Sequence, residues 1–122
     1  MPPKRRAEQG SAGLRAEQIA GAFLQRQGLT LIQSNWRCRL GEIDLVLRDG
    51  GTIVFVEVRL RTHPDFGGAA ESIGRAKRAR LLAAARLYLS GQPERPCRFD
   101  AVLLKRLEPP EIEWIRDALS DD

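Results

Sequence analysis

Residues 41–61 read GEIDLVLRDGGTIVFVEVRLR, and this stretch decides the fold. Two runs of alternating, largely β-branched residues lie on either side of Asp49-Gly50-Gly51. Glycine supplies the positive φ that a tight hairpin turn needs, so the stretch predicts two antiparallel strands joined by a turn. An acidic residue lies inside each strand, Asp44 in the first and Glu57 in the second.

The register of this hairpin decides whether the two carboxylates meet. If the two glycines form the loop, Asp49 pairs with Thr52 and Asp44 faces Glu57 directly. If the loop begins one residue earlier, Glu57 lies diagonally across from Asp44 and still on the same face. Only an odd-length loop would separate them, because a slip of one residue reverses every side chain.

Two like charges opposite each other destabilise a sheet, so this pair needs a cation, a shared proton or a solvated setting. We predict that Asp44 and Glu57 converge on a divalent metal. The alternative is a polar outer face of the hairpin, on which Arg48, Arg59 or Arg61 pairs with the carboxylates without any metal.

Composition sets the broad class of the protein. The 122 residues, 43% hydrophobic and 30% charged, suit one domain with an ordinary core. The net charge of +4 favours an acidic partner such as nucleic acid, though only through non-specific attraction. Two cysteines are too few for a disulfide framework or a zinc knuckle. Neither a membrane-spanning apolar run nor a secretory signal is present, so we expect a soluble cytoplasmic protein with no membrane contact.

The remaining chain predicts a single domain over residues 11–117, between a disordered basic arm at 1–10 and an acidic tail at 118–122. Apolar periodicity and terminal signals predict the other elements in this order: a helix over 12–27, bounded by Ser11 and Gly28; a strand over 29–34; a second helix from about 70 to 90; a strand over 97–104; and a short last strand over 112–115. This order suits a mixed sheet with a helix on each side.

Several charged side chains have both an ordinary and a functional interpretation. Glu17 borders the apolar stripe of the first helix, where most glutamates bend out to water. Lys77 lies in the stripe of the second helix, so it either snorkels from the core edge or directs its amine into a site. His63, alone in a loop, is at most a minor substrate contact. The following residues form either a solvated face or a phosphate-binding face: Arg75, Arg78 and Arg80.

An aspartate on one strand, with a glutamate and a basic residue two positions later on the next, is typical of metal-dependent phosphodiester hydrolysis. Mg²⁺ prefers oxygen ligands and is commonly held by one or two carboxylates together with substrate phosphate. Such a metal activates water and neutralises phosphate charge. In this sequence the basic residue after Glu57 is Arg59, which alternation places on the same face of the strand.

With these motifs, the sequence resembles the YraN-type family, whose members look like small relatives of archaeal Holliday junction resolvases in the PD-(D/E)XK, or restriction-endonuclease-like, superfamily. The similarity begins at about residue 12 and is carried by these segments: residues 13–28 with Glu17, Asn35, GEIDLV at 41–46, VFVEVR at 54–59, the Lys77 helix, and RFDAV at 98–102. The spacing of GEIDLV and VFVEVR is fairly specific, whereas the other segments are weak alone.

The resemblance implies an α/β fold with a restriction-endonuclease-like αβββαβ core. It implies Asp44 and Glu57 as ligands of Mg²⁺ or Mn²⁺, with the carbonyl of Val58 as a third ligand, and it adds Glu17 to the site. It also implies DNA as the partner. Resolvase-like folds commonly work as dimers, so a homodimer is expected too, although the sequence identifies no surface for it.

One position departs from the family pattern, because Arg59 stands where E-x-K has lysine. Arginine binds phosphate in a bidentate manner but cannot act as a general base. If lysine only stabilises charge, Arg59 can replace it; if proton transfer matters, Lys77 or the metal must supply that function.

Three functional hypotheses therefore stay open. The first is a metal-dependent nuclease acting on DNA, with branched or otherwise structured DNA as one candidate substrate. The second is a catalytically silent nucleic-acid-binding module that keeps the nuclease fold, which Arg59 favours. The third is a protein-interaction domain.

Overall fold

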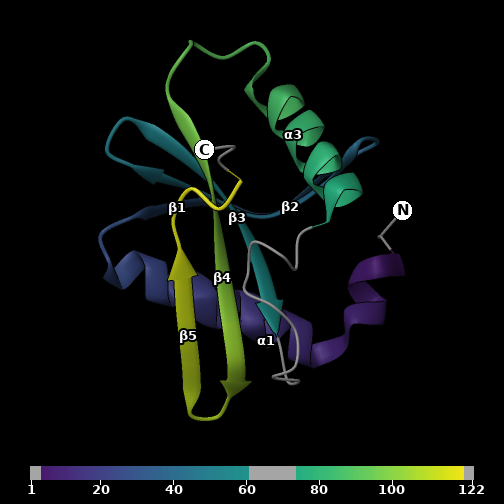
Figure 1. Ribbon diagram of the computed structural model, residues 1–122, viewed down its shortest axis with the longest axis vertical. Coiled ribbons are helices and arrows are strands. Elements are labelled where there is room, and N and C mark those ends of the chain that lie inside the picture. The colour runs from purple at the N-terminus through teal and green to yellow at the C-terminus, as the bar shows by residue number, and fades with distance from the viewer. Residues whose placement is uncertain (1–3, 61–73, 120–122) are drawn as a thin grey trace.

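The computed structural model describes residues 4–60 and 74–119. Within these residues one sheet lies between two helices, with one helix on each of its faces (Figure 1). In chain order the elements are α1 (Lys4–Arg26), β1 (Thr30–Cys38), β2 (Gly41–Asp49), β3 (Thr52–Leu60), α3 (Arg75–Leu89), β4 (Cys97–Leu107) and β5 (Pro110–Ile115). The strands lie in the order β1-β2-β3-β4-β5, and only β3 and β4 are parallel. The predicted α/β class, with a mixed sheet between helices, is confirmed.

The first helix is longer than predicted. It begins at Lys4, so Ser11 is not its N-terminus, and residues 4–10 are helical where a disordered arm was expected. These residues include lysine, arginine, alanine, glutamate and glutamine, all good helix formers. The C-terminal end is as predicted: Gly28 has φ 102°, its N–H donates to the Gln25 carbonyl at 3.0 Å, and that of Leu29 donates to Leu24 at 3.1 Å. This pair of bonds is a Schellman motif.

The hairpin of β2 and β3 has the even register counted from the sequence. Asp49 pairs with Thr52, and the pairing continues to Leu45 and Val56. β1 is longer than predicted and includes Trp36. A bulge between Leu31 and Gln33 interrupts its pairing with β2, which is why simple alternation did not reveal the full strand.

Each face of the sheet is buried by one helix. α1 packs Ala16, Ala20 and Leu24 onto the face formed by buried residues of β2, β3 and β4. α3 packs Ala84 and Ala85 onto the other face. The sheet is thus covered on both sides, and its central strands are apolar along most of their length.

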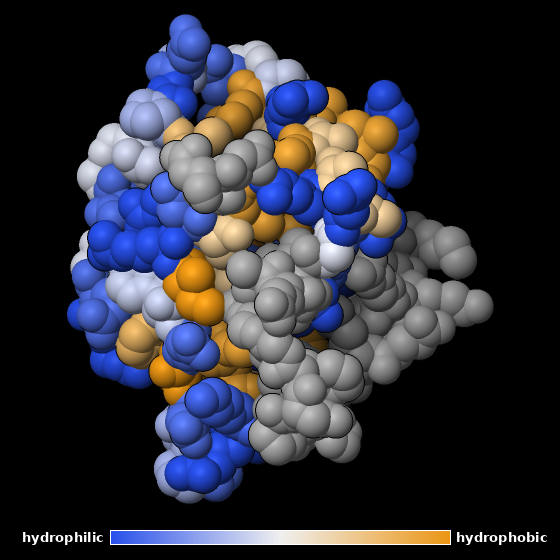
Figure 2. All heavy atoms as spheres, in the orientation of Figure 1, coloured by the Kyte–Doolittle hydropathy of each residue, from blue (hydrophilic) through white to orange (hydrophobic). Residues whose placement is uncertain are grey.

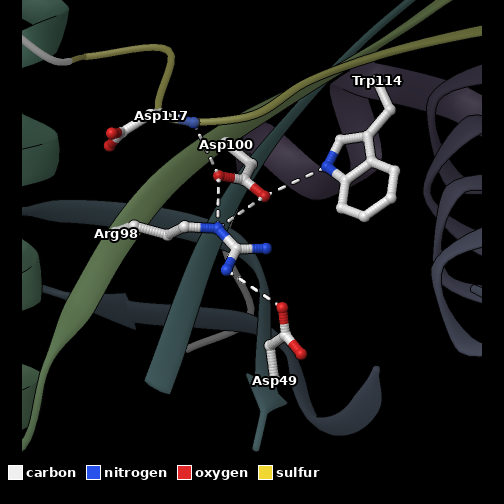
Figure 3. Close-up of polar contacts among 5 residues, drawn as sticks. All are labelled: Asp49, Arg98, Asp100, Trp114 and Asp117. Carbon is white, nitrogen blue, oxygen red and sulfur yellow. Dashed lines mark hydrogen bonds and ion pairs between the residues drawn. The ribbon is translucent and has the colours of Figure 1, made fainter. Parts of the chain in front are cut away.

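A polar network ties β4 to β5 and to the turn between β2 and β3 (Figure 3). The Asp100 carboxylate accepts hydrogen bonds from Arg98 Nε at 3.1 Å, from Trp114 Nε1 at 3.0 Å and from the Asp117 N–H at 3.0 Å. Arg98 Nη1 also donates to Asp49 Oδ2 at 3.0 Å, at the β2–β3 turn. The network fixes the β5 side of the sheet to the hairpin that carries the acidic residues.

α3 begins after Gly74, which adopts an extended conformation at the N-cap. The helix was predicted from about residue 70, and that earlier part lies outside the described residues, as does His63. Neither described helix is long and apolar enough to cross a membrane. Cys38 and Cys97 are both free.

Candidate functional site

The candidate site lies where β2 and β3 part. Their pairing ends at Leu45 and Val56, and the N–H of Val58 donates to Asp44 Oδ2 at 2.9 Å. The side-chain alternation of β2 also breaks here, because Ile43 and Val46 belong to the same cluster under α3 although they are three residues apart. We call this place the fork. Here the end of the hairpin can be reached by side chains from both helices.

Asp44 is 6% exposed, and its surroundings disfavour its charge. Burial raises the pKa of this carboxyl well above its usual range, and the charges of Glu57 and Glu17 raise it further. The Val58 N–H and the Lys77 ammonium act in the opposite direction. Three acidic side chains and one lysine therefore interact at the fork; the hairpin register had placed only Asp44 and Glu57 together, and their convergence on a metal stays a prediction.

Glu57 is held by two cations. Lys77 Nζ lies 2.8 Å from Glu57 Oε2, and Arg59 Nε lies 3.3 Å from the same oxygen. The Glu57 side chain is only 6% exposed, so its charge is balanced mainly by these partners. Lys77 thus reaches the site instead of snorkelling away, and Arg59 forms the ion pair that was the alternative to a metal.

Glu17 reaches the site from α1 and does not bend out to water. It is 7% exposed, and Asn35 Nδ2 donates to its Oε1 at 2.8 Å. Asn35 has φ 54°, a conformation that asparagine tolerates better than most residues. Sequence reasoning gave Asn35 no role, since an isolated asparagine near a strand carries little signal and the β1 bulge that positions it was not foreseen.

The donor set suits a hard divalent cation, since Asp44 and Glu57 offer carboxylate oxygens and Val58 a carbonyl oxygen. Within residues 4–60 and 74–119, however, no group of three or more histidine, cysteine, aspartate or glutamate side chains is already arranged for a metal. Lys77 and Arg59 supply the positive charge that the Glu57 carboxylate needs. The residues fit such an ion in kind, and an ion bound by Glu57 would displace the Lys77 ammonium or share the carboxylate with it.

The three arginines predicted to face phosphate lie on α3 but differ in their surroundings. Arg78 Nη2 donates to the Leu119 carbonyl at 2.6 Å and so ties α3 to the turn after β5. Arg75 and Arg80 are exposed. Figure 2 shows a mixed surface over α3, with hydrophilic side chains between hydrophobic ones. The structure therefore leaves Arg75 and Arg80 as the candidates for phosphate contacts and gives Arg78 a structural bond.

The fold is that of an α/β protein with a mixed sheet between two helices, and it is consistent with a nuclease-like core. The chain belongs to the uncharacterised protein family UPF0102, whose model matches residues 16–104, and this is the YraN-type family. It is 56% identical to a UPF0102 protein of Nitrosomonas europaea, over 92% of this chain and 96% of the relative. It is 54% identical to one of Methylobacillus flagellatus, over 86% and 93% of the two chains. A relative from Pseudomonas paraeruginosa is 48% identical over 93% and 95%.

Proposed function

We propose that this protein is a metal-dependent nuclease that hydrolyses phosphodiester bonds in DNA, with branched or otherwise structured DNA as its candidate substrate. The observation that supports this proposal is the meeting of Asp44, Glu57, Glu17 and Lys77 at the fork. Two neighbouring carboxylates where the pairing of two strands stops, with a cation from a helix beside them, are elements that metal-assisted phosphodiester hydrolysis uses. The two free cysteines are in keeping with action in the reducing cytoplasm.

In this proposal Asp44, Glu57 and the Val58 carbonyl hold Mg²⁺ or Mn²⁺. A bound ion of this kind neutralises phosphate charge and lowers the pKa of water. The Val58 N–H holds Oδ2 of Asp44, and Oδ1 would be the oxygen left to bind the ion. Glu17, held by Asn35, adds a third carboxylate beside them.

Lys77 takes the role that E-x-K gives to its lysine. Its Nζ already touches Glu57, and an amine can exchange a proton whereas the Arg59 guanidinium cannot. The Lys77 ammonium then stabilises charge on the scissile phosphate, while Arg59 binds a phosphate oxygen in its fixed fork geometry. Arg75 and Arg80 contact the backbone farther along α3.

The second candidate is a silent nucleic-acid-binding module. The observation that favours it is the Glu57–Arg59 pair, which satisfies the carboxylate without a metal. Both candidates bind DNA, and only the first cleaves it.

A cleavage assay separates them. Linear, flapped and four-way DNA are incubated with Mg²⁺ or Mn²⁺ and with wild type, Asp44→Ala or Glu57→Ala, and Glu94→Ala serves as a control because Glu94 is exposed and remote from these residues in the sequence. We expect cleavage by wild type and the control, with a loss of at least about 100-fold in the two site variants. Cleavage that survives both changes at the fork would exclude this site. DNA binding without cleavage by any form identifies the binding module.

A further inference from the structure

A groove runs between α1 and the edge strand β1 on the side of Glu17. Its volume is about 300 Å³, and its lining includes Leu14, Glu17 and Gly21 from α1 and Leu31, Ser34 and Asn35 from β1. We call it the α1–β1 groove. Because Glu17 both lines the groove and acts electrostatically on Asp44, the groove adjoins the acidic fork.

The groove has apolar walls and a polar edge. Leucines line it, and the missing side chain of Gly21 leaves a flat strip on α1; a Cβ there would lie 3.9 Å from Leu31 and 4.0 Å from Leu45. Amide and hydroxyl groups, including Ser34, form the polar part. None of its described lining residues carries a positive charge, so the groove is not built for a phosphate.

The Asn35 side chain has an acceptor oxygen for which the described residues provide no donor. Glu17 only accepts when ionised, so the hydrogen bond between them fixes the amide with Nδ2 toward Glu17 and Oδ1 turned away. Oδ1 is buried and has no hydrogen-bond partner among the described residues. A buried acceptor without a donor is costly, so a donor group that reaches Oδ1 would be bound favourably.

We propose that the α1–β1 groove holds a single unpaired nucleobase of the DNA whose backbone lies at the fork. A flat heterocycle fits between apolar walls, and its edge carries amino and imino N–H groups that can donate to Asn35 Oδ1 and Glu17. Proteins that extract a base from its stack use this combination of apolar walls and edge hydrogen bonds. The volume also lies at the lower end of the range of small-molecule sites, roughly 300–1,000 Å³. The inference rests on the proposed nuclease function and specifies its substrate as DNA with an unpaired nucleotide beside the cut.

The test measures DNA binding by fluorescence anisotropy in EDTA, so that no cleavage interferes. Three probes are compared: a duplex with one bulged guanosine, the same duplex with an abasic residue at the bulge, and a fully paired duplex. Gly21→Leu fills the groove from α1. Ser34→Leu fills it from the exposed rim of β1, where the core is not disturbed, and Ala12→Leu adds the same side chain at an exposed position of α1 outside the groove lining.

We expect wild type and Ala12→Leu to bind the base-bearing bulge about tenfold more tightly than the abasic one. In Gly21→Leu and Ser34→Leu this preference should fall to near parity, with unchanged affinity for the paired duplex and an unchanged circular dichroism spectrum. Equal binding of both bulges by wild type overturns the inference while leaving the nuclease proposal intact. A base preference that survives in a folded groove variant also overturns it. Absence of binding to any DNA, both in EDTA and with Ca²⁺ in place of Mg²⁺, overturns the proposed function and this inference together.

Discussion

The Lys77 ammonium lies 2.8 Å from Oε2 of Glu57, so a side chain of α3 closes an ion pair with a carboxylate of β3. Lys77 is therefore an internal cation at a site whose oxygens suit a divalent metal. A metal that binds Glu57 must displace this ammonium or share the carboxylate with it, and this competition can be measured.

Replacing Lys77 by methionine should make the protein less stable without metal and more responsive to it. The free energy of unfolding should fall by about 1–2 kcal/mol, because Glu57 loses a charged hydrogen bond but keeps Arg59. Thermal denaturation with and without Mn²⁺ should show a larger metal-dependent rise in melting temperature for Lys77→Met than for wild type. Arg80→Met, at an exposed position of the same helix, is the control and should behave as wild type. Equal shifts in all three proteins would contradict this competition.

Asp44→Asn should stabilise the metal-free protein at neutral pH by about 1–2 kcal/mol, since it removes a buried charge and keeps an oxygen for the Val58 N–H. The folded-state pKa of Asp44 is raised, so the folded chain holds its proton more tightly than the unfolded chain does. The contribution of Asp44 to wild-type stability is therefore greatest below the unfolded value of about 3.9 and decreases as pH rises toward the folded value.

Urea unfolding of Asp44→Asn and wild type at pH 4 and pH 7.5 measures this effect. The difference should be small at the lower pH and larger at the higher one. Glu94→Gln, an exposed carboxylate, should show no such trend. A difference independent of pH would mean that the Asp44 charge is not what the fold disfavours.

Because Lys77 supplies the amine in the proposed site, Arg59→Lys should leave Mg²⁺-dependent DNA cleavage near the wild-type level, and a large increase would show that Lys77 does not supply it. Lysine keeps the positive charge beside Glu57 and adds a second group that can exchange a proton; in a site that lacked one, the gain would be about 10²-fold or more. Arg59→Met, which keeps neither property, is the comparison. Unchanged cleavage in Arg59→Lys would show that Lys77 or the metal already supplies this function.

Asp100→Ala should destabilise the fold strongly without acting on the metal response. The Asp100 side chain is 0% exposed, and its loss leaves Arg98, itself 19% exposed, with Asp49 as its one charged partner among the described residues. Removing one member of such a buried pair costs about 3–5 kcal/mol. Urea unfolding followed by the combined fluorescence of Trp36 and Trp114 measures the loss, and Glu113→Ala, exposed on β5, is the control. A change below about 1 kcal/mol would contradict the structural role of the network.

The hairpin was predictable because the signals that specify it, the turn glycines and the alternating residues on either side, lie next to one another in the sequence. The register from Asp49–Thr52 to Leu45–Val56 is the one that counting gives when Gly50 and Gly51 form the loop, one of two even registers that the sequence left open. The fork does not follow from it, since the end of the ladder depends on a carboxylate that bonds the Val58 N–H across the hairpin. The inward direction of Glu17 likewise depends on tertiary packing, and position on the α1 stripe alone favoured solvent.

Long-range contacts account for the other differences. Arg78 was grouped with Arg75 and Arg80 by composition, but its bond to Leu119 joins residues 41 positions apart. The β1 bulge between Leu31 and Gln33 shifts the period of that strand, so its true end at Cys38 was not visible in the pattern. Nuclease activity, metal binding and DNA binding stay predictions, because they depend on partners and not on the fold.

The fork also has a consequence for how this site can tolerate mutation. Residue 58 contributes a main-chain N–H to Asp44, and the carbonyl assigned to the metal belongs to the same main chain. Neither group depends on which side chain position 58 carries, provided that it is not proline, which has no N–H. The valine there can therefore be exchanged for other β-forming residues with little effect on the hydrogen bond to Asp44. A random substitution library selected for DNA cleavage should retain many residues at position 58 and few at positions 44 and 57.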